Sequence, residues 1–257
     1  MAAMDEFRKE REAIKNAPFK QKLAYFWDYY KWHTIITLAV IIFGGSMIHN
    51  IVTKTDSVMT GVMLNTFIDD YEKKEELVDE FVKFKEIDTD DYHVELNTSY
   101  TYSLEDSSTS AQANYAVLQA IMAQGANGML DFMTGDTATM VDFAYKGWFA
   151  DLRTVLNEEQ IAEYEPYFLY VDQAVLDKIQ EASNNLEDTS QITHPDPSKP
   201  EEMEKPFPAF IDMSACKTLT DLYTYEVDRL LLGMFTNAPN PEMTLDFIAF
   251  VNEKAGD

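Results

Sequence analysis

STSAQANYAVLQAIMAQGANGMLDFMTGDTATMVDFAYK, residues 108–146, is the stretch that decides the fold. Its first part predicts a helix over residues 108–124, with Tyr115, Leu118, Ile121 and Met122 facing the core. Glycines follow as a helix stop, and residues 129–133 form a short apolar run typical of a strand. Residues 137–146 then return to helical spacing. This helix–strand–helix order is typical of an α/β layer architecture.

The same alternation extends outward in both directions. Residues 91–100 place Tyr92, Val94 and Leu96 on one face of a strand and polar residues on the other. The predicted strands cover residues 57–65, 91–100, 129–133, 167–171 and 209–213. The predicted helices cover residues 71–85, 108–124, 137–146, 217–235, one begun by an Asn157–Gln160 capping box, and a last one from Asn240 onward. Residues 182–207 are polar and proline-rich, which predicts a surface loop.

Composition limits the function classes. The chain has 257 residues, 46% of them hydrophobic, so it can bury a sizeable core. Its 45 acidic and 20 basic side chains give a formal net charge of −25. That balance argues against nucleic acid as a partner, because such binding needs Lys and Arg to neutralise phosphates. The single Cys excludes an internal disulfide and a cysteine-clustered metal site.

The stretch TIITLAVIIFGGSMIHNIVT, residues 34–53, predicts a transmembrane helix. It carries no charged side chain from Thr34 to Ile48. In hydrocarbon every backbone group must be paired internally, so an apolar run of about 20 residues forms a spanning helix. Aromatic side chains typical of a membrane interface precede it: Tyr25, Phe26, Trp27, Tyr29, Tyr30 and Trp32.

Charge asymmetry predicts the orientation of this span. Residues 1–33 hold seven basic and five acidic side chains, a net charge of +2. Because the whole chain has a net charge of −25, the remaining residues have a net charge of −27. Positive charge stays on the cytoplasmic side. We expect a cytoplasmic juxtamembrane segment (1–33), a membrane helix (34–53) and an extracytoplasmic α/β domain (55–257) in the cell membrane. An uncleaved signal anchor is favoured over a cleaved signal peptide, because the leader and the apolar run are both long. A buried core helix is the third interpretation.

Catalytic and metal signatures do not emerge from the sequence. The four His residues show no H-x-x-x-H spacing, and G-x-S-x-G, the Walker A motif and G-x-G-x-x-G are missing. We therefore expect a protein that is not an enzyme and has no cofactor and no metal site. An envelope hydrolase remains a minor alternative.

Ligand binding has a candidate site at the ends of the predicted strands. Ligands of open α/β sheets lie outside the carboxyl ends of strands. The polar residues at those ends, which form the predicted site, are Asn65, Thr66, Thr98, Tyr100, Thr134, Asp136 and Asp212. The competing interpretation is that they are ordinary turn and cap residues.

Residues 111–152 resemble one lobe of the type 2 extracytoplasmic, or periplasmic, solute-binding proteins. The resemblance rests on Asp131 in a short strand, the turn at residues 134–137, and the later Gly147, Phe149 and Asp151–Leu152. KLAYFWDYYKWH, residues 22–33, resembles the juxtamembrane part of single-span proteins of Gram-positive gut bacteria. The family has two lobes and a cleaved or lipid-modified leader, whereas this domain is about half that size. One lobe cannot close on a ligand by hinge motion.

These observations predict a single-pass bacterial membrane protein. Its acidic outer domain resembles a solute-binding lobe and would bind a small-molecule ligand or a membrane protein partner without catalysis, while its anchor contacts the lipid bilayer. The alternative is a structural or accessory subunit of a transporter or envelope complex.

Overall fold

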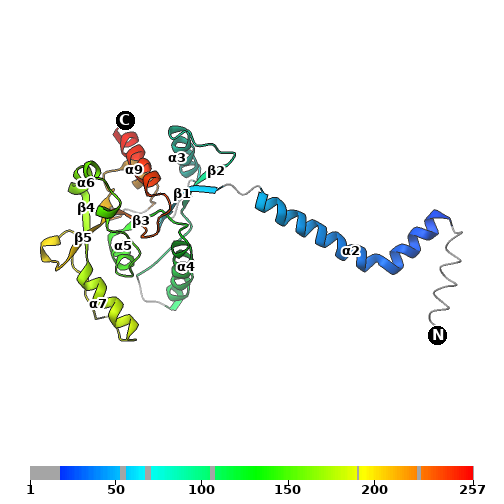
Figure 1. The fold of residues 1–257 in the computed structure, drawn as a ribbon, viewed down its shortest axis with the longest axis horizontal. Helices are drawn as coiled ribbons and strands as arrows, with labels where there is room; N and C mark the ends of the chain where they lie inside the picture. The colour runs from blue at the N-terminus through cyan, green and yellow to red at the C-terminus, as the bar shows by residue number, and fades with distance from the viewer. Residues whose placement is uncertain are drawn as a thin grey trace. The chain divides into compact units, whose positions relative to one another are not determined.

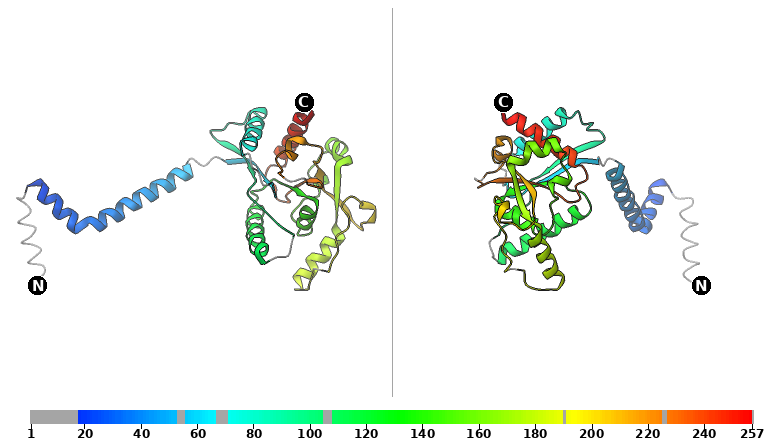
Figure 2. Two further views of the ribbon diagram at one scale, coloured as in Figure 1. Left: turned by 180° about the vertical axis from the view of Figure 1, so that it is seen from behind. Right: turned by 60° about the vertical axis from the view of Figure 1, so that its left-hand side comes forward.

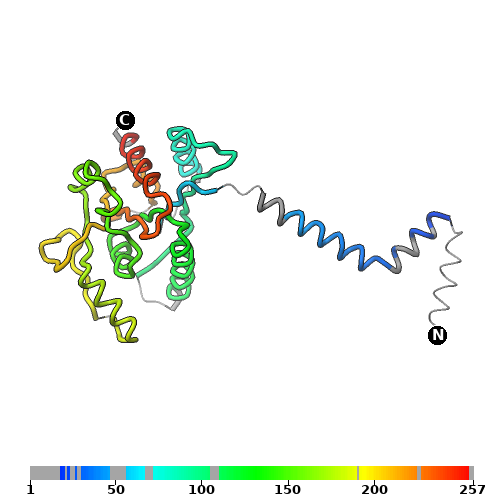
Figure 3. Tube along the Cα trace, in the orientation of Figure 1, coloured from blue at the N-terminus to red at the C-terminus, as the bar shows by residue number. Residues whose placement is uncertain are grey.

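The computed structural model describes residues 18–52, 56–66, 71–104, 108–189, 191–224 and 227–256 (Figure 3). The chain divides into two compact units, residues 1–54 and residues 55–257. Residues 1–17 of the predicted cytoplasmic segment lie outside the described part.

The first unit contains helix α2 (Phe19–Val52), which begins directly after Pro18. Proline suits the start of a helix because its missing N–H has no intrahelical partner there. Along the predicted span the apolar side chains are exposed, from Ile35 at 46% to Phe43 at 75%. The side chains of residues 47–52, and residue 53 entirely, lie outside the described part. Among the residues that the structure describes, we find no helix with the length and apolarity needed to cross a membrane.

In the described part of the second unit, six strands form one sheet in the order β2-β1-β3-β6-β5-β4 (Figure 1). The strands are β1 (Asp56–Met63), β2 (Tyr92–Asn97), β3 (Phe132–Asp136), β4 (Phe168–Asp172), β5 (Pro206–Asp212) and β6 (Leu230–Met234). Strand β1 pairs in parallel with β2 and β3. Strands β3, β6, β5 and β4 pair antiparallel in turn. The predicted α/β class is confirmed, with a mixed sheet.

Helices cover both faces of this sheet (Figures 1 and 2). One face carries α3 (Tyr71–Phe84), α6 (Glu158–Tyr164), α8 (Lys217–Thr220) and α9 (Pro241–Gly256), and the other carries α4 (Ser108–Ala126), α5 (Thr137–Ala144) and α7 (Gln173–Asn184). Successive strand residues point to opposite faces. Met59 and Met63 of β1 therefore pack with α3 and α9, whereas Val62 packs with α4 and α5. Short 3-10 turns connect the layers at Leu152–Thr154, Glu165–Tyr167 and Pro200–Glu202.

Elements with strong local signals agree with the sequence. Helix α6 has the predicted capping box, because the Asn157 side chain accepts from the Gln160 N–H and the Gln160 side chain accepts from the Asn157 N–H. Helices α3 and α9 lie where amphipathic spacing and the Pro241 start predict them. Gly128 has φ +61°, the left-handed conformation that ends α4.

The prediction of a helix over residues 217–235 is wrong. Of the residues in this range that the structure describes, only Lys217–Thr220 are helical, and residues 230–234 form β6, between β3 and β5. The run Leu230–Met234 is buried at every position. A strand covered on both faces has a continuous apolar sequence and no alternation, so its pattern does not distinguish it from a buried helix.

Three further predictions need correction. Strand β3 starts at Phe132 rather than at residue 129, since Met129 is exposed and pairing with β1 involves residues 132–134. The predicted loop at 182–207 includes the end of α7 and the start of β5. Tyr115 and Met122 do not face the core. They are 65% and 53% exposed, while Ile121 is fully buried.

Candidate functional site

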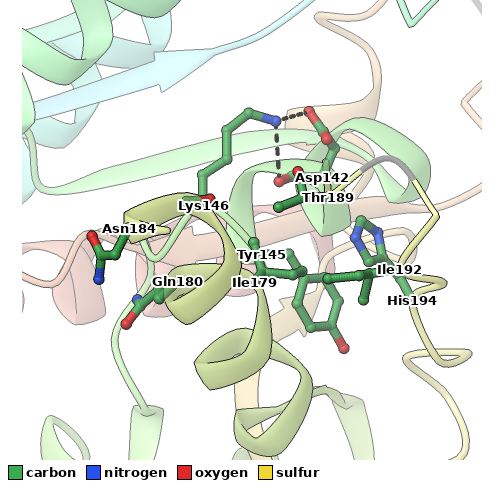
Figure 4. Close-up of a pocket in the computed structure, with 10 residues that line it drawn as sticks. Asp142, Tyr145, Lys146, Ile179, Gln180, Asn184, Thr189, Ile192 and His194 are labelled. Carbon is green, nitrogen blue, oxygen red and sulfur yellow. Dashed lines mark hydrogen bonds and ion pairs between the residues drawn. The ribbon is translucent and has the colours of Figure 1, made fainter. Parts of the chain in front are cut away.

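A groove of about 740 Å³ lies between α5, α7, Thr189 and residues 192–194 (Figure 4). We call it the α5–α7 groove. Its lining residues are Asp142, Tyr145, Lys146, Ile179, Gln180, Ser183, Asn184, Thr189, Ile192 and His194. A volume of roughly 300–1,000 Å³ is typical of small-molecule sites.

Helix α5 supplies the charged wall of the groove. Asp136, at the end of β3, caps this helix by accepting a hydrogen bond of 3.0 Å from the Thr139 N–H. Residues three and four positions apart share one helix face. Asp142 lies on α5 and Lys146 lies four residues later, in the turn that follows the helix, and the two form an ion pair along the groove (Figure 4). The Tyr102 hydroxyl donates to Asp142 Oδ2 at 3.3 Å. Burial, with the Asp142 charge, raises the pKa of Tyr102 to about 12, so this hydroxyl keeps its proton.

Tyr145 supplies an aromatic wall. The imidazole of His194 stacks on its ring with 4.2 Å between the ring centroids and 18° between the planes. The Asp172 N–H donates to the Tyr145 hydroxyl at 3.1 Å, which fixes the far end of the ring. Tyr145 itself is 2% exposed, so the stack also anchors the segment that carries His194.

Asp172 connects this wall to α7. Its carboxylate accepts from the N–H groups of Ala174, Glu204 and Lys205 at 2.9–3.0 Å, and so caps α7 and holds the start of β5. Burial alone would raise the pKa of Asp172, but these three donors hold it below its usual value.

Helix α7 supplies uncharged hydrogen-bonding groups. Ile179, Gln180 and Asn184 lie on its groove-facing side (Figure 4), and Ser183 lines the groove as well. Within the described part of the chain, the side-chain amides of Gln180 and Asn184 have no hydrogen-bond partner. An amide offers both donors and an acceptor, so two such groups can bind hydroxyls of either orientation.

The groove carries little net charge in a strongly acidic chain. Asp142 and Lys146 compensate one another. Burial of the His194 ring against Tyr145 lowers the pKa of His194; the Asp142 charge opposes this shift and the Lys146 charge adds to it. His194 is therefore neutral at pH 7, since its ordinary pKa is already about 6.5. The exposed imidazole of His194, neutral amides and one compensated ion pair suit a polar, uncharged molecule.

The structure brings the predicted residues together at one end of the strands, where β1, β2 and β3 have their carboxyl ends. Strands β1, β2 and β3 are parallel, so their carboxyl ends coincide. The Asn65 N–H donates to the Tyr100 carbonyl at 3.0 Å. The Thr66 hydroxyl donates to the Thr98 carbonyl at 3.2 Å, and the Tyr100 hydroxyl accepts from Gln124 Nε2 at 2.6 Å. These contacts connect the loops after β1 and β2.

Thr134, Asp136 and Asp212 lie at the same end of the sheet as the loops after β1 and β2. Asp136 and Asp212 end β3 and β5 on either side of the start of β6. The Thr134 hydroxyl is buried and 2.8 Å from the Tyr223 hydroxyl, and Asp212 forms an ion pair of 3.2 Å with Arg229. Each of these seven predicted residues has a structural contact, and a ligand-binding role for them stays a prediction.

Sequence reasoning missed the α5–α7 groove. Asp142 and Lys146 were assigned to a helix, but the facing helix α7 was not predicted. Its signal was available: Asp172 at the cap, followed by Val175, Ile179 and Ala182 at helical spacing. As for metals, no group of three or more His, Cys, Asp or Glu side chains with metal-binding proximity occurs among the residues the structure describes.

No protein-family model matches the chain. No curated protein sequence matches it either. Among solved structures, the chain is similar to the ABC substrate-binding protein Lmo0181 from Listeria monocytogenes, in complex with cycloalternan. The two share 13% sequence identity with a TM-score of 0.35, over 79% of this chain and 77% of that chain. The assignment of this chain to the α/β class accordingly rests on its own sheet and helices.

Proposed function

We propose that the α/β unit, residues 55–257, binds a small, neutral, polar molecule in the α5–α7 groove without catalysis. Sugars belong to this ligand class. The observation that carries the proposal is the juxtaposition of two unpartnered amides, Gln180 and Asn184, with the Tyr145–His194 ring stack in one groove. Both amides are exposed, so a ligand exchanges their hydrogen bonds to water for hydrogen bonds to itself.

The chain's net charge of −25 supports the choice of a neutral ligand. An anion would be repelled by the overall field, and the compensated Asp142–Lys146 pair leaves no free cation in the groove. The proposal agrees with the resemblance of residues 111–152 to one lobe of the solute-binding proteins. Since the groove amides Gln180 and Asn184 are exposed to water, we expect a weak and readily reversible complex.

A thermal-shift panel tests this function on the full chain in detergent. The panel contains neutral sugars, short peptides and divalent metal ions. We expect stabilisation by at least one neutral sugar, because a ligand that binds only the folded state raises the melting temperature. A panel without any sugar-dependent shift would contradict the proposal.

A matched pair of variants locates the effect. The double variant Gln180→Ala/Asn184→Ala removes both groove amides and should abolish the shift. Asn252→Ala removes an exposed amide from α9, outside the groove, and should retain it. An equal loss in both variants would indicate binding elsewhere.

The proposal includes a membrane anchor formed by residues 34–53, with the α/β unit outside the cell. It is supported by the uncharged stretch from Thr34 to Ile48 and by the exposed apolar side chains of α2. Protease added to intact cells should digest the α/β unit, and permeabilised cells provide the control. Protection in intact cells, or a mature chain that begins after residue 53, would contradict the anchor.

The alternative function is that of an accessory subunit that docks on another membrane protein. The edge position of β2 favours it, because in the described sheet β2 pairs with β1 alone. A groove of about 490 Å³ lies beside β2, lined by residues of α3 and by residues 94–99. An added strand could pair with such an edge. Loss of partner copurification in Val94→Pro, with the sugar response intact, would favour this alternative.

A further inference from the structure

Helix α4 presents an exposed side that carries no charge. Exposed residues recur along it with spacings of three and four, which places them on one helix face: Gln112, Tyr115, Ala116, Gln119, Met122, Ala123 and Ala126. From residue 107 to residue 130 the sequence contains no charged side chain, although charged residues make up 25% of the whole chain. Tyr115 and Met122 are the large apolar residues of this α4 face.

A small pocket lies at the C-terminal end of the α4 face. It has a volume of about 220 Å³. Helix α4 lines it with Ile121, Met122, Gly125 and Ala126, and the facing residues are Gly147, Trp148, Phe235, Thr236 and Asn237. Tyr115 projects from the N-terminal half of the same face. The face thus combines an exposed aromatic side chain with an apolar pocket that can accommodate one.

We propose that α4 pairs with α4 of a second copy of this chain, antiparallel, about a two-fold axis near Gln119. Tyr115 lies four residues before Gln119, and the helical residues of the pocket, 121–126, are centred about four residues after it. A two-fold axis at Gln119 consequently places Tyr115 of each copy over the pocket of the other. Two-fold interfaces require such self-complementarity.

Charge favours a second copy at this face. Two chains of net charge −25 repel one another, and like charges brought face to face are costly. The α4 face is a surface on which two identical chains can meet without such contacts. The two Gln119 amides, one from each copy, can hydrogen-bond across the axis.

The area of the α4 face limits the affinity of the proposed pairing between two copies. Helix α4 has 19 residues, and with a rise of ~1.5 Å per residue it is about 28 Å long. A helix diameter of about 10 Å then limits the footprint to roughly 300 Å² per copy. That is well below the ~800 Å² per partner of a standard interface. We therefore expect weak, reversible pairing, which chemical cross-linking can capture.

Cysteine cross-linking tests the pairing in the full chain reconstituted in liposomes. Gln119→Cys places two thiols at the axis, and mild oxidation should give a disulfide-linked dimer on a non-reducing gel. The native Cys216 is buried, so the wild-type chain should give no disulfide-linked dimer on this gel. Gln112→Cys lies on the same exposed face, but in an antiparallel pair its two copies are separated by about 14 residues, or about 21 Å. It should give at least tenfold less dimer.

Two more variants examine the contact itself. Tyr115→Ala in the Gln119→Cys background should reduce the dimer yield at least fivefold, whereas Tyr167→Ala, which truncates an exposed tyrosine elsewhere, should leave it unchanged. Circular dichroism confirms that each variant is folded. Equal cross-linking at positions 112 and 119 would overturn the antiparallel pairing, as would its absence at 119 or its persistence in Tyr115→Ala. The sugar response of the α5–α7 groove should be intact in all of these variants.

Discussion

His194 is stacked on Tyr145 with 4.2 Å between ring centroids, although 49 positions separate the two residues along the chain. This contact joins helix α5 to the segment that follows α7 and forms one wall of the α5–α7 groove. Because Asp142 and Lys146 face the same imidazole, the contact also makes the groove sensitive to pH.

Protonation of His194 should destabilise the folded chain. Burial lowers the pKa of His194 in the folded state below its ordinary value of about 6.5. Between the folded and the unfolded pKa the unfolded chain binds more protons, so the free energy of unfolding rises with pH. Stability should fall as pH drops through 6.5 and level off below the folded pKa.

Urea unfolding of the full chain in detergent at several pH values between 8 and 5 measures this dependence. His194→Gln removes the titrating group and should flatten this part of the profile. A wild-type slope that persists in His194→Gln would show that another group is responsible.

The contributions of the Thr134 and Tyr223 hydroxyls to the free energy of unfolding should be coupled. The Thr134 and Tyr223 hydroxyls lie 2.8 Å apart, and both residues are buried. Tyr223→Phe leaves the Thr134 hydroxyl without this partner and should lower the free energy of unfolding by about 1–2 kcal/mol. Thr134→Val should cost a similar amount, and the double variant should cost clearly less than the sum. Additive effects in this double-mutant cycle would contradict the coupling.

The aromatic ring of Phe132 should exclude a side chain at Gly61. A Cβ added there would clash with the ring of Phe132, which belongs to β3, a strand paired with β1. Overpacking of this kind costs about 1–3 kcal/mol or more. Gly61→Ala should therefore melt well below the wild type. Gly135→Ala, whose added Cβ meets Met140 at 3.4 Å, is the matched control and should melt much closer to it.

Asp172 should be important for the stability of the groove wall. Its carboxylate accepts three backbone hydrogen bonds, at the start of α7 and before β5. Asp172→Ala removes a helix cap and two loop contacts, and we expect a loss of about 2–3 kcal/mol. Asp177→Ala, on the exposed side of α7, should cost about 0.5 kcal/mol or less. Equal losses in chemical unfolding would contradict the role of Asp172.

Local signals account for the parts of the fold that were predictable. Helices α3 and α6 have amphipathic spacing or a capping box within a few residues, so their information is local. Strand β6 was assigned to a helix because Leu230–Met234 is apolar throughout. Its central position in the sheet, and not its local sequence, determines its conformation.

The candidate sites also differ in how far the sequence predicts them. Polar residues after parallel strands were expected to share an edge, and Asn65, Thr98 and Thr134 do. The α5–α7 groove depends on contacts between residues 142–146 and 179–194, which are distant in sequence. Spacing alone carries no information on such contacts. For the same reason the sequence did not predict that the side chains of Tyr115 and Met122 are exposed to solvent.

Ligand-observed saturation-transfer NMR on the full chain tests the central claim most directly. A mixture of neutral mono- and disaccharides is recorded with the wild type, with Gln180→Ala/Asn184→Ala and with Asn252→Ala. The account predicts transfer to at least one sugar in the wild type and in Asn252→Ala, and its loss in the double variant. No transfer in the wild type, or undiminished transfer in the double variant, would contradict binding in the α5–α7 groove.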